Sequence, residues 1–387
     1  MAEPPNSQTP LKVVFFGTYR EEFTRTTNVI EGLRLNGVKV IECHEQLWHS
    51  IDDRVQVVRG GWFSLHFVQR LFQAYGRLLR KYRQIGDYDL LIVGYPGQLD
   101  VLIGWILTRL RRKPLVWDVL MSVYLLMIER NLGTSNGLTK SLIHVVESIG
   151  LRLPELLIVE GDDYANWLSK EYSLNPHKFQ KVPLGTNERN FPSLLSTLTP
   201  EQPNFHVAYF GSFLRNHGLD QMIKAAELLK NEETIQFEFI GIGPEYKETV
   251  SYSKEKELNN VTFSGYLPSE QFFMHIAKTD LCLGSFGQTT HSMITIQNKI
   301  YETLIMGKPL LTGESPAILK VFISGTHLIT SPRNPQEIAV KIKFLRDNPE
   351  ILSVIAEQGQ DYVMRNFSLQ PLGKRFLDSI LPLIHSD

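Results

Sequence analysis

The sequence is short of the features that mark several common classes of protein. Its 387 residues include only two cysteines, Cys43 and Cys282, and its formal net charge is −1. A disulfide-stapled secreted domain needs more cysteines, and bulk binding of nucleic acid needs an excess of positive charge. Each cysteine lies in or beside an apolar strand pattern, so we expect two buried free thiols in a reducing cytoplasm. No cluster of metal ligands is visible, so no metal site is expected.

Long apolar runs and targeting signals are also missing. The longest apolar run, residues 119–128, is interrupted by Ser122 and is about half as long as the roughly 20 residues that span a bilayer. The N-terminal sequence MAEPPNSQTP is polar and proline-bearing, without the basic and apolar regions of a signal peptide. We therefore expect a disordered lead-in over residues 1–10 and a cytoplasmic chain that does not cross a membrane.

Short aliphatic runs alternate with longer helical patterns from one end of the chain to the other. This alternation is typical of βαβ units and parallel sheets, and the chain is longer than a single core usually grows. Residues 186–204 lack both periodicities and are rich in Pro, Ser, Thr and Asn, which indicates a linker. The expected fold class is α/β, with two Rossmann-like domains over residues 11–185 and 205–365 and a C-terminal helix over residues 366–387.

Strand patterns fall in both halves. They are expected over residues 12–16, 38–42, 89–93, 114–117, 155–159, 179–183, 205–210, 235–240, 260–263, 280–283, 308–312 and 326–329. Apolar residues at helical spacing between positions 218 and 230 predict a helix that packs one face on the second sheet; they are Leu219, Met222, Ile223, Ala226 and Leu229.

Residues 281–313 are the most informative part of the sequence. They predict a strand, a polar loop over residues 285–297, a short helix over residues 298–306 and a second strand. A helix N-terminus binds anions through its unpaired amides, and Lys299 in the first turn adds a full positive charge. Glu302, one turn further along, is placed to accept hydrogen bonds from a ribose diol. The spacing fits a nucleotide-diphosphate pocket, and it also fits a surface helix whose Lys and Glu are merely solvated.

Residues that directly follow the strands form a second set of candidates, because ligands of doubly wound sheets bind beyond the carboxyl ends of the strands. Glycine at these exits lets the backbone approach a ligand closely, although strand-to-helix turns favour glycine for their own sake. The exit residues are Gly17, Thr18, Tyr19, Arg20, residues 94–97, Asp118 and residues 160–164 in the first half, and Gly211, Ser212, Gly241, Ile242, Gly243, Ser285, Phe286, Gly287, Gly313 and Glu314 in the second.

With these residues in view, the chain resembles the retaining glycosyltransferases of family 4, whose two-domain fold is called GT-B. In the C-terminal half the resemblance rests on VAYFGSFLRNHGLDQMIKAAELL (207–229), FEFIGIGPE (237–245), LCLGSFG (281–287) and NKIYETLIMGKPLLTGESPA (298–317). In the N-terminal half, VVFFGTYREEFTRTTNVIEGLRLNGVKVIECHEQLW (13–48) and VGYPGQLD (93–100) are similar to the acceptor domain of one subgroup. The ordered set covers nearly the whole chain.

The resemblance implies a donor site in a cleft between two facing domains, and a C-terminal helix that crosses back to the N-terminal domain. The diphosphate of a UDP- or GDP-linked sugar would lie at the helix of Lys299, with its ribose on Glu302, so the functional interpretation of this helix becomes the preferred one. The nucleotide sugar is a substrate, and neither a cofactor nor nucleic acid is implied. The expected donor-binding residues are Gly17, Gly211, Ser212, Arg215, His217, Gly241, Phe286, Gly287, Asn298, Lys299, Ile300 and Glu302.

Several positions depart from the family pattern. Members commonly carry two glutamates separated by seven residues; the second matches Glu302, and the first falls at Ile294, which cannot hydrogen-bond a sugar. An arginine and a lysine often contact the phosphates from the loop that opens the second domain, where this chain has Ser212 and His217. Arg215, on the same loop, is a candidate replacement for the missing cation.

The implied reaction transfers a hexose with retention and without a metal ion. Lys299 and the helix amides from Ile300 onward would stabilise the leaving diphosphate, each such contact typically being worth about a hundredfold to a thousandfold in rate. The acceptor hydroxyl would attack from the same face and lose its proton to a donor phosphate oxygen. Asp118 and Tyr164, which replaces a histidine common in the family, are the catalytic candidates on the acceptor side. Asp118 fits equally well as a helix N-cap or as a partner for Arg130.

A basic stretch suggests a further partner. Seven Lys or Arg residues and no acid occur between Arg54 and Arg83. Residues 64–82 within it combine an apolar stripe with basic side chains, and residues 109–113 add charge nearby. Such a helix lies on an anionic membrane surface, or it packs on a core and leaves a solvated basic face. Because acceptors of this family are often lipid-linked, peripheral contact with the inner face of the cytoplasmic membrane is a hypothesis to test.

Two functions from different classes therefore remain. The first is a glycosyltransferase that acts on a glycan or lipid-linked acceptor in cell-surface polysaccharide biosynthesis. The second is a catalytically degenerate protein that binds nucleotide or sugar as a scaffold, an alternative that Ile294, Ser212 and Tyr164 keep open. A dinucleotide dehydrogenase is disfavoured, because no G-x-G-x-x-G opens a βαβ unit with an acid at the end of the next strand.

Overall fold

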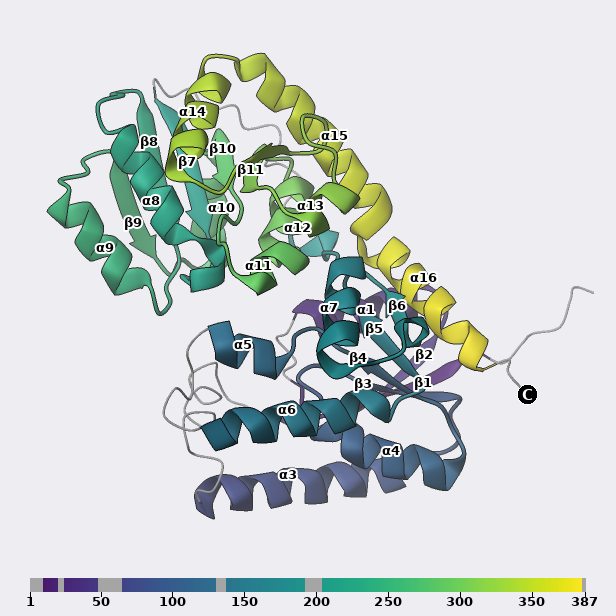
Figure 1. Cartoon of the computed structure of the whole chain (residues 1–387). Helices are drawn as coiled ribbons and strands as arrows, with labels where there is room; N and C mark the ends of the chain where they lie inside the picture. Colours follow the sequence, from purple (N-terminus) through teal and green to yellow (C-terminus); the bar gives the residue numbers. More distant parts are fainter. Residues whose placement is uncertain (1–9, 20–23, 48–64, 130–136, 192–203, 385–387) are drawn as a thin grey trace, which may run out of the picture. The chain divides into compact units, whose positions relative to one another are not determined.

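The computed structural model describes residues 10–19, 24–47, 65–129, 137–191 and 204–384. It divides into two compact units, Met1–Pro183 together with Leu369–Asp387, and Leu184–Ser368. Each unit contains one parallel six-stranded sheet with helices on both faces (Figure 1). The sequence-based expectation of two Rossmann-like α/β domains is thereby confirmed.

The first unit is built on a sheet with the order β2-β1-β3-β4-β5-β6. Its central strands are buried on both faces, which explains why they appear in the sequence as continuous aliphatic runs such as LLIV. The strands are β1 Lys12–Gly17, β2 Lys39–His44, β3 Leu90–Val93, β4 Leu115–Asp118, β5 Leu156–Val159 and β6 Phe179–Lys181.

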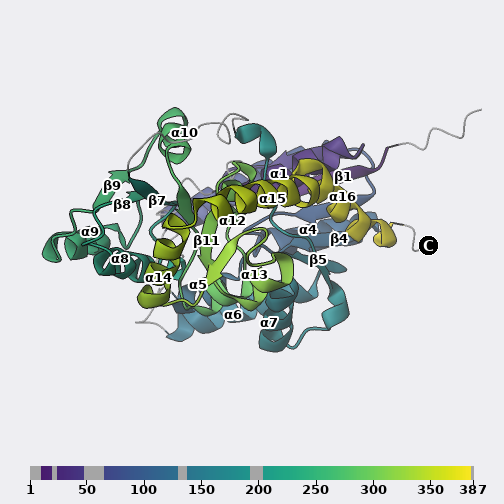
Figure 2. The same ribbon diagram turned by 90° about the horizontal axis from the view of Figure 1, so that it is seen from above.

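Helices α1 Thr24–Leu35 and α16 Leu369–Ile380 cover one face of this sheet. They approach so closely that a Cβ on Gly373 would lie 2.0 Å from the carbonyl oxygen of Gly32. The chain therefore returns to the first unit at its C-terminus, as expected for the GT-B architecture (Figure 2).

The opposite face of the first sheet is covered by the helices that connect successive strands in right-handed crossovers. These helices are α3 Leu65–Arg83, α4 Asp100–Arg111, α5 Val123–Glu129, α6 Gly137–Arg152 and α7 Asp162–Tyr172. Gly104 of α4, for example, packs against side chains of β3 and β4.

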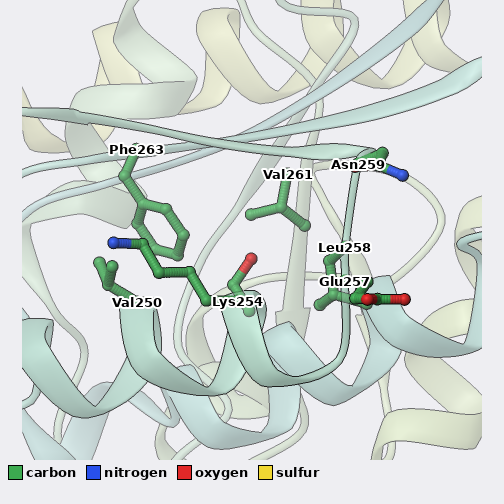
Figure 3. Close-up of a pocket in the computed structure, with 8 residues that line it drawn as sticks. Val250, Lys254, Glu257, Leu258, Asn259, Val261 and Phe263 are labelled. Atoms are coloured by element: carbon green, nitrogen blue, oxygen red, sulfur yellow. The ribbon is translucent and has the colours of Figure 1, made fainter.

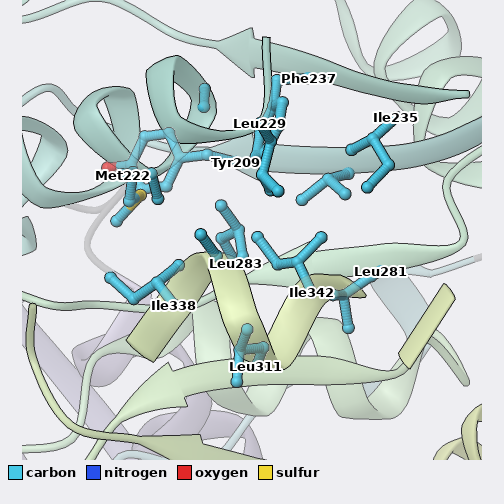
Figure 4. Packing of buried hydrophobic residues seen from close by; sticks show 14 of the residues in the cluster. Tyr209, Met222, Leu229, Ile235, Phe237, Leu281, Leu283, Leu311, Ile338 and Ile342 are labelled. Carbon is cyan, nitrogen blue, oxygen red and sulfur yellow. The ribbon is translucent and has the colours of Figure 1, made fainter. Parts of the chain in front are cut away.

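The second unit is built on a sheet with the order β12-β11-β10-β7-β8-β9. Side chains from β7, β8, β10 and β11 meet those of two covering helices in one apolar cluster (Figure 4). The strands are β7 Phe205–Phe210, β8 Ile235–Ile240, β9 Val261–Gly265, β10 Leu281–Leu283, β11 Leu310–Gly313 and β12 Ile329–Ser331. The covering helices are α8 Leu219–Leu228 and α14 Pro335–Arg346, and the apolar residues predicted for the first of them are all buried.

The remaining helices of the second unit are α9 Tyr246–Glu255, α10 Ser269–Ala277, α11 Thr290–Ile294, α12 Asn298–Ile305, α13 Pro316–Val321 and α15 Pro349–Phe367. Two local expectations were wrong. Residues 285–297 are not a loop throughout, because Thr289 caps the short helix α11 by accepting a hydrogen bond from Ser292 N. The last strand begins at Ile329 and not at residue 326, because residues 325–327 form a turn in which Gly325 has a φ of 81°.

Further expectations concern the linker, the N-terminal lead-in, the two cysteines and membrane-spanning helices. Residues 186–191 of the expected linker belong to the second unit, where Thr186 N bonds Phe367 O at 2.8 Å and Glu188–Asn190 form a 3₁₀ turn; residues 192–203 lie outside the described part. Most of the expected N-terminal lead-in is likewise outside it. Both cysteines are buried free thiols, as predicted. No helix in the described ranges is long and apolar enough to span a membrane.

Candidate functional site

Two glycines shape the carboxyl edge of the second sheet. Gly211, directly after β7, has a φ of 127°, and a Cβ there would lie 3.1 Å from Lys299 Nζ. Gly241, directly after β8, has a φ of 132°, and a Cβ there would lie 2.0 Å from the carbonyl oxygen of Gly211. These two expected donor residues therefore let the strand exits pack backbone against backbone and leave room for the lysine.

Lys299 lies in the first turn of α12 and is only 5 % exposed. Its Nζ lies 3.8 Å from the centroid of the Tyr209 ring and 3.3 Å from His217 Nδ1. Burial lowers the pKa of Lys299 well below its usual 10.5, and the carboxylate of Glu302 partly offsets this. Within the described residues Lys299 forms no ion pair, so its ammonium group is supported by His217 Nδ1 and by the ring face of Tyr209.

Glu302 lies one turn further along α12, as predicted, and is half-buried. Burial raises the pKa of its carboxyl group, while the neighbouring Lys299 lowers it. Because the two residues are three positions apart, α12 presents a basic and an acidic side chain on one side, at the edge of the sheet.

The loop after β7 holds a network around Tyr209. The Tyr209 hydroxyl donates to the carbonyl oxygen of Ser212 at 2.8 Å, and His217 Nδ1 lies 2.7 Å from that oxygen and 2.8 Å from the hydroxyl. Ser212 is exposed and contributes only its carbonyl group to this network. Arg215 begins the 3₁₀ turn Arg215–His217 and is exposed, so its guanidinium is open to an anionic ligand.

The loop after β10 is held by backbone contacts. Phe286 N donates to His217 O at 2.8 Å, and the hydroxyls of Ser285 and Ser292 both donate to Asn216 O. The side chain of Phe286 is fully buried in the core of the second unit, as is that of Ile300. These two expected donor residues can therefore contact a ligand only through their backbone.

Two donor candidates remain, Asn298 and Gly287, and Ile294 lies close to them in the sequence. Asn298 is the first residue of α12 and is half-buried, and Gly287 packs directly on the carbonyl group of Asn216. Ile294 ends α11 and is half-buried, which places an aliphatic side chain where the resembled family has a carboxylate.

Arg333 is a buried cation that the sequence interpretation missed. Its guanidinium donates to the carbonyl oxygens of Glu314 at 2.6 Å and Gly313 at 3.1 Å, and also to that of Gly287. Burial lowers its pKa to about 10. Arg333 follows β12 by two residues, so it is itself a strand-exit residue, whereas the exits considered from the sequence ended with Glu314, after the preceding strand.

Two hollows lie in the second unit, and neither is lined by Lys299 or Glu302. One, of about 620 Å³, lies between α9 and the edge strand β9, where Lys254 extends towards Phe263 (Figure 3). The other, of about 580 Å³, borders the loop after β10 and includes Gln288, Glu314 and Arg333. No group of three or more His, Cys, Asp or Glu suited to a metal ion occurs in the ranges that the structure describes.

In the first unit, Asp100 fixes the exit of β1. Its carboxylate accepts hydrogen bonds from Thr18 N at 2.9 Å and from the Tyr75 hydroxyl at 2.7 Å. Gly17 has a φ of 144°, and a Cβ there would lie 2.6 Å from Asp100 Oδ2. The predicted donor role of Gly17 thus rests on a loop that a buried carboxylate holds, and burial raises the pKa of Asp100.

Asp118, a catalytic candidate, is 1 % exposed and forms an ion pair with Arg25. Arg25 Nε and Nη2 lie 3.0 and 2.9 Å from its two carboxylate oxygens, and Arg25 also donates to the carbonyl groups of Val182 and Pro183. The ion pair supports a structural role for Asp118, with Arg25 as its partner. Arg130, the partner expected from the sequence, lies outside the described residues.

Tyr164, the other acceptor-side candidate, is fully buried in α7 and stacks on Trp167 with 6.2 Å between ring centroids. Burial and the nearby Glu147 raise the pKa of its phenol well above 10. Both properties are those of a core residue. A role for Tyr164 or Asp118 in proton transfer stays a prediction.

The architecture is that of the GT-B class, as three solved structures indicate by their similarity. Sucrose-phosphate synthase from Thermosynechococcus elongatus has a TM-score of 0.73 at 14 % identity, over 98 % of this chain and 100 % of that one. Anabaena HepE in complex with UDP-glucose has a TM-score of 0.65 at 17 % identity, over 96 % and 99 %. A glycosyltransferase from Rickettsia africae has a TM-score of 0.66 at 12 % identity, over 98 % and 100 %.

The second unit also carries a sequence signature. Residues 204–348 match the profile of the family described as Glycosyl transferases group 1. This range contains Gly211, Lys299, Glu302 and Arg333, that is, the whole cluster at the carboxyl edge of the second sheet. No curated protein sequence matches the chain.

Proposed function

We propose that the chain is a retaining, metal-independent glycosyltransferase of family 4, which moves a hexose from a UDP- or GDP-linked donor to a glycan or lipid-linked acceptor. The observation that carries the proposal is the buried Lys299 in the first turn of α12, one turn before Glu302 and next to Gly211. All three residues lie within the range that matches the glycosyltransferase profile. HepE, one of the similar structures, is in complex with UDP-glucose, which supports a nucleotide-sugar donor.

The donor half of the mechanism uses groups of the second unit. Lys299 and the amides that begin α12 would neutralise the charge that develops on the leaving diphosphate, and the exposed Arg215 would add a second cation. Glu302 would accept hydrogen bonds from the ribose hydroxyls. The cations would thus come from the protein, and this is why we propose that no metal ion takes part.

The acceptor half of the mechanism concerns the attacking hydroxyl and its proton. The acceptor hydroxyl would attack the face that the diphosphate leaves and would pass its proton to a phosphate oxygen of the donor, which gives retention without a protein nucleophile. This route suits the first unit, where Asp118 is paired with Arg25 and Tyr164 is buried. We place the reaction in the cytoplasm, in the synthesis of a cell-surface polysaccharide.

The test is a panel of UDP- and GDP-sugars, incubated with the full chain in the presence of a chelator. We expect thermal stabilisation by one nucleotide and slow hydrolysis of the matching sugar donor. Lys299→Met should weaken nucleotide affinity about tenfold to a hundredfold, because a buried charge-assisted contact is lost, and it should slow hydrolysis by about a hundredfold or more. The anomeric configuration of the released or transferred sugar, read by NMR, tests retention.

Lys308 supplies the matched control. It is also a lysine of the second unit, 5 % exposed like Lys299, but its Nζ donates to the carbonyl groups of Ala277 and Thr279. Lys308→Met removes a buried charge of the same kind beyond the C-terminal end of α12, opposite to the end that carries Lys299, so its nucleotide affinity should stay at the wild-type level. Equal losses in both variants would contradict the assignment of Lys299.

The scaffold remains a second candidate, and Ile294 is the observation that favours it. An aliphatic side chain at this position cannot hold a sugar hydroxyl, so donor binding without transfer is the expected behaviour of such a protein. Thermal protection by nucleotide sugars with no hydrolysis, across the whole panel, would select this candidate over the enzyme.

A further inference from the structure

Helices α3, α4 and α6 lie side by side on one face of the first sheet, with α4 in the middle. The Arg111 guanidinium at the end of α4 lies 4.5 Å from the centroid of the Tyr82 ring in α3, and it donates to the carbonyl group of Ile85. At its other end α4 packs on α6, where a Cβ on Gly150 would lie 3.1 Å from Val101. The outer sides of the three helices therefore adjoin one another.

This surface has no exposed acid of its own. The sequences of the three helices contain nine basic residues but only two acids, Asp100 and Glu147. Each acid is 1 % exposed and is hydrogen-bonded inside the unit, Asp100 to Tyr75 and Glu147 to Tyr172. The helices thus turn both of their negative charges inward.

Part of the positive charge is unneutralised. Arg77 and Lys81 form ion pairs with Glu45, and Arg109 with Glu155. Arg80 and Arg83 near the end of α3, and Arg112 directly after α4, are exposed and meet no carboxylate among the described residues. Because Arg111 at the end of α4 contacts Tyr82 and Ile85 at the end of α3, these three cations lie at the same end of the surface.

Apolar side chains are exposed on the same helices. Leu110 is 77 % exposed, between Arg109 and Arg111, and Ile106 lies one turn earlier at 53 %. On α3, Phe72 is 74 % exposed, although most of the apolar stripe of that helix, including Phe67 and Leu78, is core. On α6 the exposed apolar residues follow helical spacing and are Leu142, Val145 and Ile149.

We propose that the outer surface of α3, α4 and α6 docks the first unit on an anionic lipid bilayer. A bilayer surface offers a layer of negative headgroups for the arginines and an apolar interior for Leu110, Ile106 and Phe72, and a helix face of this composition matches both. A nucleic acid would match the positive charges of this surface but not its exposed apolar side chains. Of the two alternatives for α3, most of its apolar stripe packs on the core, and on this helix it is Phe72 that is left for the lipid, together with the exposed apolar residues of α4 and α6.

The experiment is flotation of the full chain with vesicles, in the absence of nucleotide, so that its outcome does not depend on the proposed transferase activity. We expect binding to vesicles with about one-third anionic lipid, no binding to zwitterionic vesicles, and release as salt is raised to about 0.5 M. Arg83→Gln and Arg112→Gln should each weaken binding about fivefold. Leu110→Ser should weaken it further without changing the salt dependence.

Matched controls come from exposed positions of the second unit. Arg365→Gln removes an arginine whose side chain is 75 % exposed, and Val340→Ser removes an apolar residue that is 64 % exposed. Both should leave vesicle binding unchanged. If they weaken binding as much as the changes on α3 and α4, the proposed surface is wrong, and equal binding to zwitterionic vesicles would also overturn it.

Trp105 provides a readout of the surface itself. Trp105 lies on α4 and is half-buried, and the Arg109 guanidinium lies over its ring, 5.9 Å from the ring centroid. Lipids brominated in their chains should quench its fluorescence on binding, and Trp105→Phe should remove most of the quenching. Binding without quenching at Trp105 would move the contact to another face, and a protein partner that is retained by this surface in the absence of lipid would replace the bilayer as its occupant.

Discussion

At the scale of single residues, Lys299 holds its charge where charge is costly. The ammonium group is buried and forms no ion pair in the described part of the chain, and the Tyr209 ring face supports it from 3.8 Å. A cation over an aromatic ring is worth up to about 2 kcal/mol when desolvated. Tyr209 is therefore expected to position Lys299 and to favour its protonated form.

We predict that nucleotide affinity depends on pH through Lys299. Burial lowers the lysine pKa in the free protein, and a bound diphosphate favours the charged form, so affinity falls as pH rises through the free-state pKa. In Tyr209→Leu this fall should begin at a lower pH, with affinity about tenfold weaker near neutrality. Isothermal titration with UDP or GDP across the pH range measures both quantities.

Two variants separate this effect from core packing. Tyr209→Phe keeps the ring and should keep the pH at which affinity falls. Phe239→Leu removes a buried ring of the same core, 6.1 Å from Tyr209 and without contact to Lys299, and should lower stability only. A shift of the pH profile in Phe239→Leu as large as in Tyr209→Leu would count against the role given to Tyr209.

The ion pair of Arg25 and Asp118 yields a second prediction. Asp118→Asn should destabilise the first unit by about 3–5 kcal/mol, because it leaves Arg25 buried without its counter-charge. The double change Arg25→Met with Asp118→Leu should recover most of this loss. Urea unfolding of the full chain measures both effects; an Asp118→Asn protein with unchanged stability and no transfer activity would instead support the catalytic assignment.

Which residues the sequence revealed depends on the distance over which they interact. Lys299 and Glu302 could be proposed together because they share one short helix with a recognisable spacing. Asp100 was missed because it bonds Thr18, 82 positions away, and Arg25 was not paired with Asp118 because 93 positions separate them. Contacts of that range depend on the strand order, which one sequence does not display.

At the scale of elements, helices α1 and α16 are in backbone contact with each other. Gly32 and Gly373 lie backbone against backbone, so neither position has space for a methyl group. This contact attaches the C-terminal helix to the first unit, together with the buried side chains Leu372 and Phe376.

We predict that Gly373→Ala destabilises the first unit by about 1–3 kcal/mol, the usual cost of overpacking a filled contact. Its matched control is Gly76→Ala in α3, where a Cβ meets nothing within 4 Å and where the change should stabilise by about 0.5–1 kcal/mol. Thermal unfolding distinguishes the two. A neutral Gly373→Ala would mean that α16 can shift along α1.

Prediction of the elements failed where a local signal was short. The cap at Thr289 gave α11 only five residues, too few for a helical period to show. The turn that begins at Gly325 moved the start of β12 from residue 326 to Ile329. The long elements and the alternation of strands and helices were predictable, because their periods extend over many residues.

At the scale of the whole molecule, α16 makes the stability of the first unit depend on the C-terminus. Leu372, Phe376 and Ile380 are fully buried there, and each is worth about 1.5–3 kcal/mol. A chain that ends at Ser368 should therefore lose the fold of the first unit and keep that of the second. Limited proteolysis with mass spectrometry should find a resistant fragment close to residues 184–368 and rapid cleavage elsewhere.

The control for this truncation is a chain that ends at Ile380. It lacks only the short 3₁₀ turn Leu381–Leu383 and the residues after it, none of which is fully buried in the described part. Its proteolytic pattern should match that of the intact chain. A resistant first unit in the shorter truncation would show that α16 is dispensable.

The two buried cysteines give the protein a practical property. Burial raises the pKa of Cys43 and of Cys282 to about 12, so only about one thiol in 10⁵ is ionised at neutral pH. A maleimide label should therefore ignore both and react with a cysteine introduced at an exposed site. One such site in each unit, for example at Arg112 and Arg365, would let spin labels or fluorophores report the separation of the two units in solution while both native cysteines stay in place.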